Sequence, residues 1–173
     1  MYLKIKKINN KVINDAQDFF WVSFCSNLKK EKLWTYNESL IARYLINKNT
    51  QVVKESCFSS ISHKKDLVFI WINKTKIWVD IEILKERDIS LLEENKVDNW
   101  ESFYRLWTAK ECIIKFENLL LDDMKQILLI KSEKIDKKVS WIKFNLKFIF
   151  KFDNKNFNVL SWNKEKIYYS ICF

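Results

Sequence analysis

Several short stretches of the chain either alternate apolar and polar residues or are almost continuously apolar, and both patterns predict β-strands. These stretches are residues 2–8, 57–62, 67–72, 77–83, 127–130, 139–152, 157–162 and 167–173. Apolar residues recur at helical spacing over residues 15–28, 37–46 and 100–118, which predicts three helices. The order of strand, helices, strands, helix and strands predicts an α+β fold.

The predicted elements divide into two similar groups. We expect two similar lobes, a pseudo-dimer, at residues 1–84 and 85–173, each with a helix packed on an antiparallel sheet. A chain of 173 residues is long enough for two lobes that share one core, and short for two independent domains. We expect one compact unit and a monomer, because both lobes already belong to one chain.

Glycine and proline are absent from the sequence. Their absence excludes P-loops and Rossmann fingerprints, which need glycine at fixed positions. Alanine and arginine are also scarce, which indicates an AT-rich genome. The formal net charge is +9, which favours an anionic partner such as nucleic acid, a membrane surface, a phosphorylated ligand or an acidic protein. The same codon bias raises the lysine content, so the charge alone does not choose among these partners.

The cysteines and the apolar runs indicate the compartment. Cys25, Cys57, Cys112 and Cys172 are far apart and form no CxxC pair, so we expect neither a zinc site nor a disulfide framework. No apolar run reaches the roughly 18 residues of a membrane helix. We therefore expect a cytoplasmic protein with reduced thiols and no membrane partner.

Two carboxylates lie side by side on the strand predicted at residues 77–83. Alternation places Asp80 and Glu82 on one face and the isoleucines and valine on the other. Paired carboxylate oxygens are ligands that a hard cation such as Mg²⁺ prefers. An ordinary solvated strand face is the competing interpretation, and these residues alone favour it.

The helix predicted at residues 100–118 carries a second group of charges. On a helical wheel Glu111 falls inside the apolar stripe, with Lys115 one turn further along the same face and Lys110 on its flank. A carboxylate directed into an apolar face is costly unless it is paired or bound to a metal. The alternative is a surface pair of Glu111 with Lys115.

The only histidine in the chain, His63, stands beside Ser62 and two lysines. In a predicted turn it is either a solvated residue or a contact for a phosphate group.

Three stretches together resemble the 4′-phosphopantetheinyl transferase superfamily, and are most similar to its single-chain, surfactin-synthetase-activating type. They read SISH at residues 60–63, WVDIE at residues 78–82 and FYRLWTAKECIIK at residues 103–115. The last is similar to the family signature W-[ST]-x-K-E-x-x-x-K, and the second to G-[IV]-D-[IV]-E. The resemblance covers residues 37–118, where the helix around Arg43 is the weaker match.

This resemblance implies transfer of the 4′-phosphopantetheine arm of coenzyme A to a serine of an acyl or peptidyl carrier protein, with release of 3′,5′-ADP, in pathways such as fatty acid biosynthesis. It implies that Mg²⁺ is held by Asp80, Glu82 and Glu111. Glu111 would also accept the proton of the carrier serine, and Lys115 would steady the pyrophosphate. The positions that match coenzyme A contacts are Arg43, Ser62, His63, Lys110 and Lys115.

The chain departs from the family pattern at one position of the metal strand. Trp78 stands where the family has glycine, and the Gly-Lys-Pro stretch upstream of the Ser-His element is absent. Two alternatives stay open: a catalytically inactive relative, and a basic module that binds single-stranded nucleic acid through lysines and aromatic rings. The resemblance favours the transferase, with no nucleic acid partner.

Overall fold

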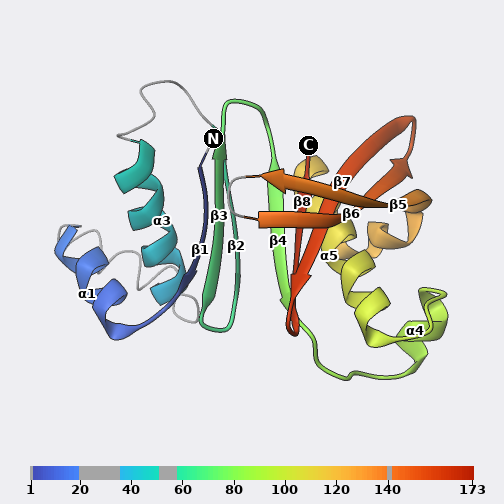
Figure 1. Cartoon of the computed structure of the whole chain (residues 1–173), viewed down its shortest axis with the longest axis horizontal. Helices are drawn as coiled ribbons and strands as arrows, with labels where there is room; N and C mark the ends of the chain where they lie inside the picture. The colour runs from blue at the N-terminus through green and yellow to red at the C-terminus, as the bar shows by residue number, and fades with distance from the viewer. Residues whose placement is uncertain (1, 20–35, 51–57, 140–141) are drawn as a thin grey trace. The chain divides into compact units, whose positions relative to one another are not determined.

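A computed structural model describes residues 2–19, 36–50, 58–139 and 142–173 (Figure 1). The predicted α+β fold is confirmed, because the described residues form helices and two antiparallel sheets. The elements are β1 (Tyr2–Lys7), α1 (Asn10–Phe19), α3 (Tyr36–Thr50), β2 (Phe58–Lys64), β3 (Leu67–Asn73), β4 (Trp78–Ile83), α4 (Ser90–Glu94), α5 (Trp100–Glu117), the 3₁₀ helix η1 (Leu121–Gln126), β5 (Leu128–Val139), β6 (Ile142–Phe152), β7 (Lys155–Lys164) and β8 (Ile167–Cys172).

The chain divides into two compact units, unit 1 at Met1–Lys76 and unit 2 at Ile77–Phe173. This division falls before β4, whereas the sequence suggested a boundary after residue 84. The reason is strand pairing: β4 is hydrogen-bonded to β8 along its whole length, from Trp78 opposite Cys172 to Ile83 opposite Ile167. The strand with the paired carboxylates therefore belongs to the same unit as α5.

Unit 1 is an antiparallel sheet in the order β1-β3-β2, with helices on one face (Figure 1). Alternate residues of β3, Val68, Ile70 and Ile72, are buried and pack against α1 and α3. Burial of such side chains on one face is what holds a helix on a sheet.

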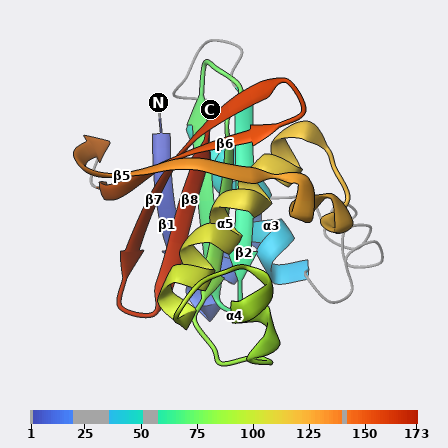
Figure 2. The same cartoon turned by 90° about the vertical axis from the view of Figure 1, so that its right-hand side faces the viewer.

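Unit 2 has a sheet in the order β4-β8-β7-β6-β5, and α5 packs against β8, β4 and β7 (Figure 2). The side chain of Asn99 caps the start of α5 by accepting the backbone N–H of Ser102 at 2.8 Å. The helix ends at Glu117, and the next residue, Asn118, caps it in the left-handed conformation.

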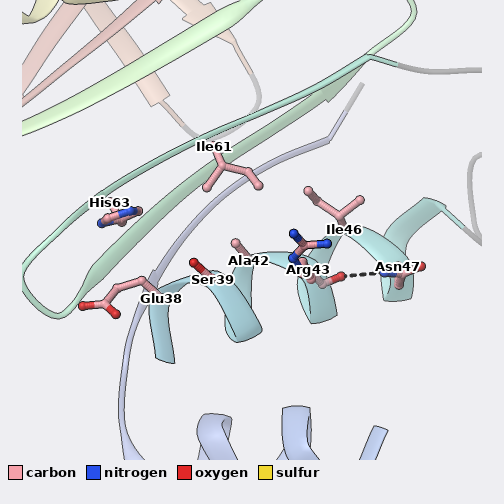
Figure 3. Close-up of a pocket in the computed structure, with 8 residues that line it drawn as sticks. All are labelled: Glu38, Ser39, Ala42, Arg43, Ile46, Asn47, Ile61 and His63. Atoms are coloured by element: carbon pink, nitrogen blue, oxygen red, sulfur yellow. Dashed lines mark hydrogen bonds between the residues drawn. The ribbon is translucent and has the colours of Figure 1, made fainter. Parts of the chain in front are cut away.

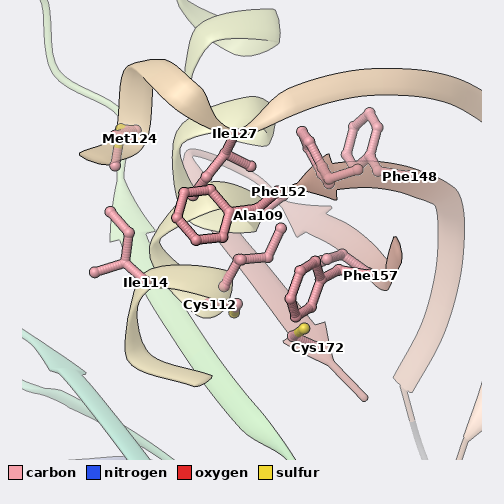
Figure 4. Close-up of a cluster of buried hydrophobic side chains, with 12 residues drawn as sticks. Ala109, Cys112, Ile114, Met124, Ile127, Phe148, Phe152, Phe157 and Cys172 are labelled. Carbon is pink, nitrogen blue, oxygen red and sulfur yellow. The ribbon is translucent and has the colours of Figure 1, made fainter. Parts of the chain in front are cut away.

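A cluster of buried apolar side chains in unit 2 joins α5 to the sheet (Figure 4). Ala109, Cys112 and Ile113 of the helix meet phenylalanines of β6 and β7. Cys112 and Cys172 lie in this cluster as free thiols, as the sequence predicted for these two. Cys25 and Cys57 lie outside the described residues.

Left-handed backbone is supplied here by residues other than glycine. In the described part of the chain these are Lys65, Lys96, Asn118, Asp153 and Glu165, each with φ between 51° and 58°. Three of them lie in the tight turns of the hairpins β2-β3, β6-β7 and β7-β8. Each forces a Cβ into a conformation that glycine adopts without cost.

Several predicted elements differ from the observed ones. Helix α1 begins at Asn10, earlier than predicted, and the part of that prediction beyond Phe19 falls outside the described residues. The single strand predicted over residues 139–152 is wrong at its start, because Val139 ends β5 and β6 begins at Ile142. The short helices α4 and η1 were not predicted. No helix in the described ranges is long and apolar enough to span a membrane.

Candidate active site

Asp80 and Glu82 are buried in unit 2. Asp80 is 3% exposed and Glu82 is 8% exposed, so the interpretation of an ordinary solvated strand face is wrong. The cause is the packing of α5 across β4 and β8: alternation along β4 directs these two side chains and Trp78 toward the helix. Two acids buried on one face require compensation by positive charge or hydrogen bonds.

Lys115 of α5 supplies positive charge at this face. Its Nζ donates to Oδ1 of Asp80 at 2.5 Å and lies 3.9 Å from Oε2 of Glu111, one helical turn earlier. Burial by itself would lower the pKa of Lys115, but the negative charges of Asp80 and Glu111 outweigh it, and the pKa is raised. Lys115 therefore stays protonated and holds the two carboxylates around one cationic atom.

The side chain of Glu111 is 21% exposed. At about 100° per residue it lies between Tyr104 and Ile114, which are both buried, so its position agrees with the predicted place inside the apolar stripe. Glu111 also pairs with Lys115, and this pair is joined to Asp80 of a separate strand, which helical spacing could not show.

Lys110 lies on a different side of the helix. Its ammonium donates to the backbone carbonyl of Met124 in η1 at 3.3 Å, and burial lowers its pKa. The structure therefore does not bring Lys110 to the cluster of Asp80, Glu111 and Lys115.

In unit 1, Arg43 and His63 line a common groove of about 470 Å³ between α3 and β2 (Figure 3). The remaining lining residues include Glu38, Ser39 and Asn47. Ser39, Arg43 and Asn47 stand four residues apart, so a polar stripe along residues 39–47 is the sequence signal that could have found them.

Ser62 does not share this groove. It follows Ile61 and precedes His63 in β2, and both neighbours line the groove. Because successive side chains of a strand point to opposite faces, Ser62 faces the other side of the sheet, where it is 5% exposed.

Two residues that were not predicted as site residues contact each other beside the carboxylates. Oγ1 of Thr108 lies 2.9 Å from Oγ of Ser170, and both residues are fully buried. Ser170 is the cross-strand neighbour of Asp80. A lone serine within the apolar strand at residues 167–173 is the signal that could have pointed to it.

Within the described ranges, no group of three or more His, Cys, Asp or Glu side chains is arranged as a ready metal site. The donors nonetheless fit a hard cation in chemistry, since all three expected ligands are carboxylates. Two of them, Asp80 and Glu111, already share the ammonium of Lys115.

No protein-family model matches the chain, and no curated protein sequence matches it.

Proposed function

We propose that the protein transfers the 4′-phosphopantetheine arm of coenzyme A to a serine of an acyl or peptidyl carrier protein and releases 3′,5′-ADP. The observation that carries the proposal is the contact of Lys115 with both Asp80 and Glu111. These residues come from two motifs separated in the sequence, and they meet as a cluster of carboxylates and one ammonium. Such a cluster suits a reaction that depends on positioning and charge neutralisation.

In this proposal Asp80, Glu82 and Glu111 hold Mg²⁺, which supplies neutralisation of the pyrophosphate charge. Glu111 is the base for the carrier serine, because its carboxylate is 21% exposed and so keeps access for an incoming hydroxyl. Lys115 binds the pyrophosphate. Its side chain is 32% exposed, which supports a role in contact with a substrate.

The groove beside Arg43 and His63 is the proposed contact for a phosphate group of coenzyme A. Arginine suits this role because its guanidinium forms paired hydrogen bonds with phosphate oxygens. Ser62 lies on the opposite sheet face from His63, and Lys110 lies on a different side of α5 from Lys115. We therefore propose that these two residues contact coenzyme A less directly. We further propose that the two units are similar lobes, and that the protein is a cytoplasmic monomer.

Mass spectrometry of an apo carrier protein tests the function. The carrier is incubated with coenzyme A, Mg²⁺ and the protein, and a mass gain equal to the phosphopantetheine arm is the expected result. Glu111→Gln should abolish the gain. Glu117→Gln is the matched control, because Glu117 lies on the same helix, is similarly shielded at 17% exposure and pairs with Lys155 instead.

If no carrier protein of the source genome gains the arm, the proposed function is wrong. Equal activity of Glu111→Gln and the unmodified protein would overturn the assignment of the base.

A further inference from the structure

Ser170 in β8 lies beneath α5 and beside Asp80. Its side chain is fully buried, and its position in β8 is directly opposite Asp80 in β4. Neighbouring strands are about 4.8 Å apart, so the two side chains are adjacent on the sheet face that α5 covers.

Two successive turns of α5 bind Ser170. Oγ1 of Thr108 lies 2.9 Å from Oγ of Ser170, and the thiol of Cys112 donates to the Ser170 carbonyl at 3.2 Å. Thr108 also lies 2.9 Å from the carbonyl of Tyr104. A hydroxyl has one proton to donate, so Thr108 donates to Tyr104 and accepts from Ser170.

Thr108, Cys112 and Lys115 are spaced by four and three residues, which places them on one face of the helix. The first two contact Ser170, and the third contacts its neighbour Asp80. The bonds to Ser170 thus add a directional constraint on the height and the rotation of α5 to the apolar packing of the helix on the sheet. Those two quantities determine where the ammonium of Lys115 and the carboxylate of Glu111 stand relative to Asp80.

We propose that Ser170, through its hydrogen bond to Thr108, is a positioning residue that holds Glu111 and Lys115 in register with Asp80. The expected effect on kcat rests on the proposed function. The expected coupling between Ser170 and Lys115 in the stability of the fold does not. Substitutions of residues that orient metal ligands typically weaken metal affinity or activity by about 10- to 100-fold.

Ser161 offers a matched control for Ser170. It is the cross-strand neighbour of Ser170 in β7 and is also fully buried, but its hydroxyl has no hydrogen-bond partner among the described residues. Ser161→Ala removes the same atom from the same sheet face without removing a hydrogen bond to α5. We expect this variant to keep the properties of the unmodified protein.

The first measurement compares kinetics and Mg²⁺ binding. Ser170→Ala should lower kcat and weaken Mg²⁺ affinity by calorimetry, each by about tenfold or more, because Glu111 is displaced as a ligand while the ammonium of Lys115 is still present to compete for the carboxylates. KM for coenzyme A should change less than about twofold. Thr108→Val should lower kcat and Mg²⁺ affinity as Ser170→Ala does. Thr108→Ser should leave both close to the values of the unmodified protein, because serine keeps the hydroxyl. Equal losses in Ser161→Ala and Ser170→Ala would overturn the proposal.

The second measurement is independent of activity. Denaturant unfolding of Ser170→Ala, Lys115→Met and the double variant forms a cycle, and the same cycle is made with Ser161→Ala. We expect the Ser170 cycle to depart from additivity by about threefold or more in the unfolding constant, and the Ser161 cycle to be additive. An additive Ser170 cycle would refute the positioning role even if the protein proves to be a transferase. If the Ser170 cycle is non-additive but the protein shows no transfer activity, the proposed function is refuted and the positioning role of Ser170 is supported.

Discussion

The ammonium of Lys115 lies 2.5 Å from Oδ1 of Asp80, although 35 positions separate the two residues in the chain. Asp80 is nearly fully buried and Lys115 is partly exposed. The contact places a cation of the protein itself against a carboxylate that is a proposed ligand of Mg²⁺. Several expected properties of the protein depend on this arrangement.

The first prediction is that Lys115 competes with Mg²⁺ for Asp80. In Lys115→Met the ammonium is removed, so the carboxylates lose their resident cation and should bind Mg²⁺ about tenfold more tightly. Phosphopantetheine transfer should be lost, since the pyrophosphate then lacks its lysine. Isothermal calorimetry with Mg²⁺ measures the first effect, with Lys110→Met as control because Lys110 contacts Met124 instead. Weaker Mg²⁺ binding in Lys115→Met would contradict the competition.

A second prediction concerns the groove in unit 1. Arg43→Ala should raise KM for coenzyme A by about tenfold or more with kcat little changed, because a charge-assisted hydrogen bond to phosphate contributes about 1.5 to 3 kcal/mol. Lys48→Ala is the control: Lys48 is a cation on the same helix that donates to the hydroxyl of Tyr44 at 3.2 Å and does not line the groove. Steady-state kinetics measures KM for coenzyme A in both variants. Equal increases would show that the effect comes from the loss of positive charge in general and not from the groove.

A third prediction links Tyr169 to stability at high pH. Burial, with a smaller effect of Glu165, raises the pKa of Tyr169 from its ordinary value of 10.0 to about 12. Between these values the folded protein keeps a proton that the unfolded chain releases, so the free energy of unfolding falls as the pH rises from about 10 to about 12. In Tyr169→Phe this decline should be smaller by on the order of 1 kcal/mol.

The phenylalanine ring keeps an aromatic partner for Trp162, whose ring lies 4.5 Å from that of Tyr169. Denaturant unfolding across this pH range compares the two proteins, and the other tyrosines and the lysines contribute equally to both. Parallel curves would show that Tyr169 does not carry the effect.

A fourth prediction uses the absence of glycine. Lys65 has a φ of 51° in the turn between β2 and β3, so Lys65→Gly should raise the free energy of unfolding by about 0.5 to 1 kcal/mol through relief of strain. Lys151→Gly, at an exposed position inside β6, should lower it by a similar amount. Thermal or denaturant unfolding measures both. A loss of stability in Lys65→Gly would contradict the argument.

Most strands could be predicted because their pattern is local. Residues 67–72 and 77–83 alternate or are continuously apolar, and β3 and β4 follow these stretches closely. The start of β6 was missed because apolar residues recur from Val139 onward with no glycine or proline among them. Most of β5 was missed because residues 131–138 contain one apolar side chain, Ile135, and therefore show no alternation. The short helices α4 and η1 have too few residues to show a helical period.

The candidate site was predictable in part. That Asp80 and Glu82 share a face follows from alternation within one strand, and the order of charges on α5 follows from helical geometry. The contact of Lys115 with Asp80 could not be predicted, because the rotation of α5 over the sheet depends on what the helix packs against, including the tyrosines and serine of β8. Ser62 and His63 are neighbours in the sequence, yet alternation along β2 separates them onto two faces.

The sequence by itself determined the elements that carry chemistry, including the acidic strand, the helix predicted at residues 100–118 and the spacing of Glu111 and Lys115, since these depend on residues close together in the chain. Only the tertiary structure decided that α5 covers β4 and buries both acids, that Lys115 rather than Lys110 meets Asp80, and that Ser170 contacts Thr108. The physical reason is that the contact of a helix with a sheet depends on the packing of many side chains that are far apart in the sequence. The spacing of residues within one element does not determine that packing.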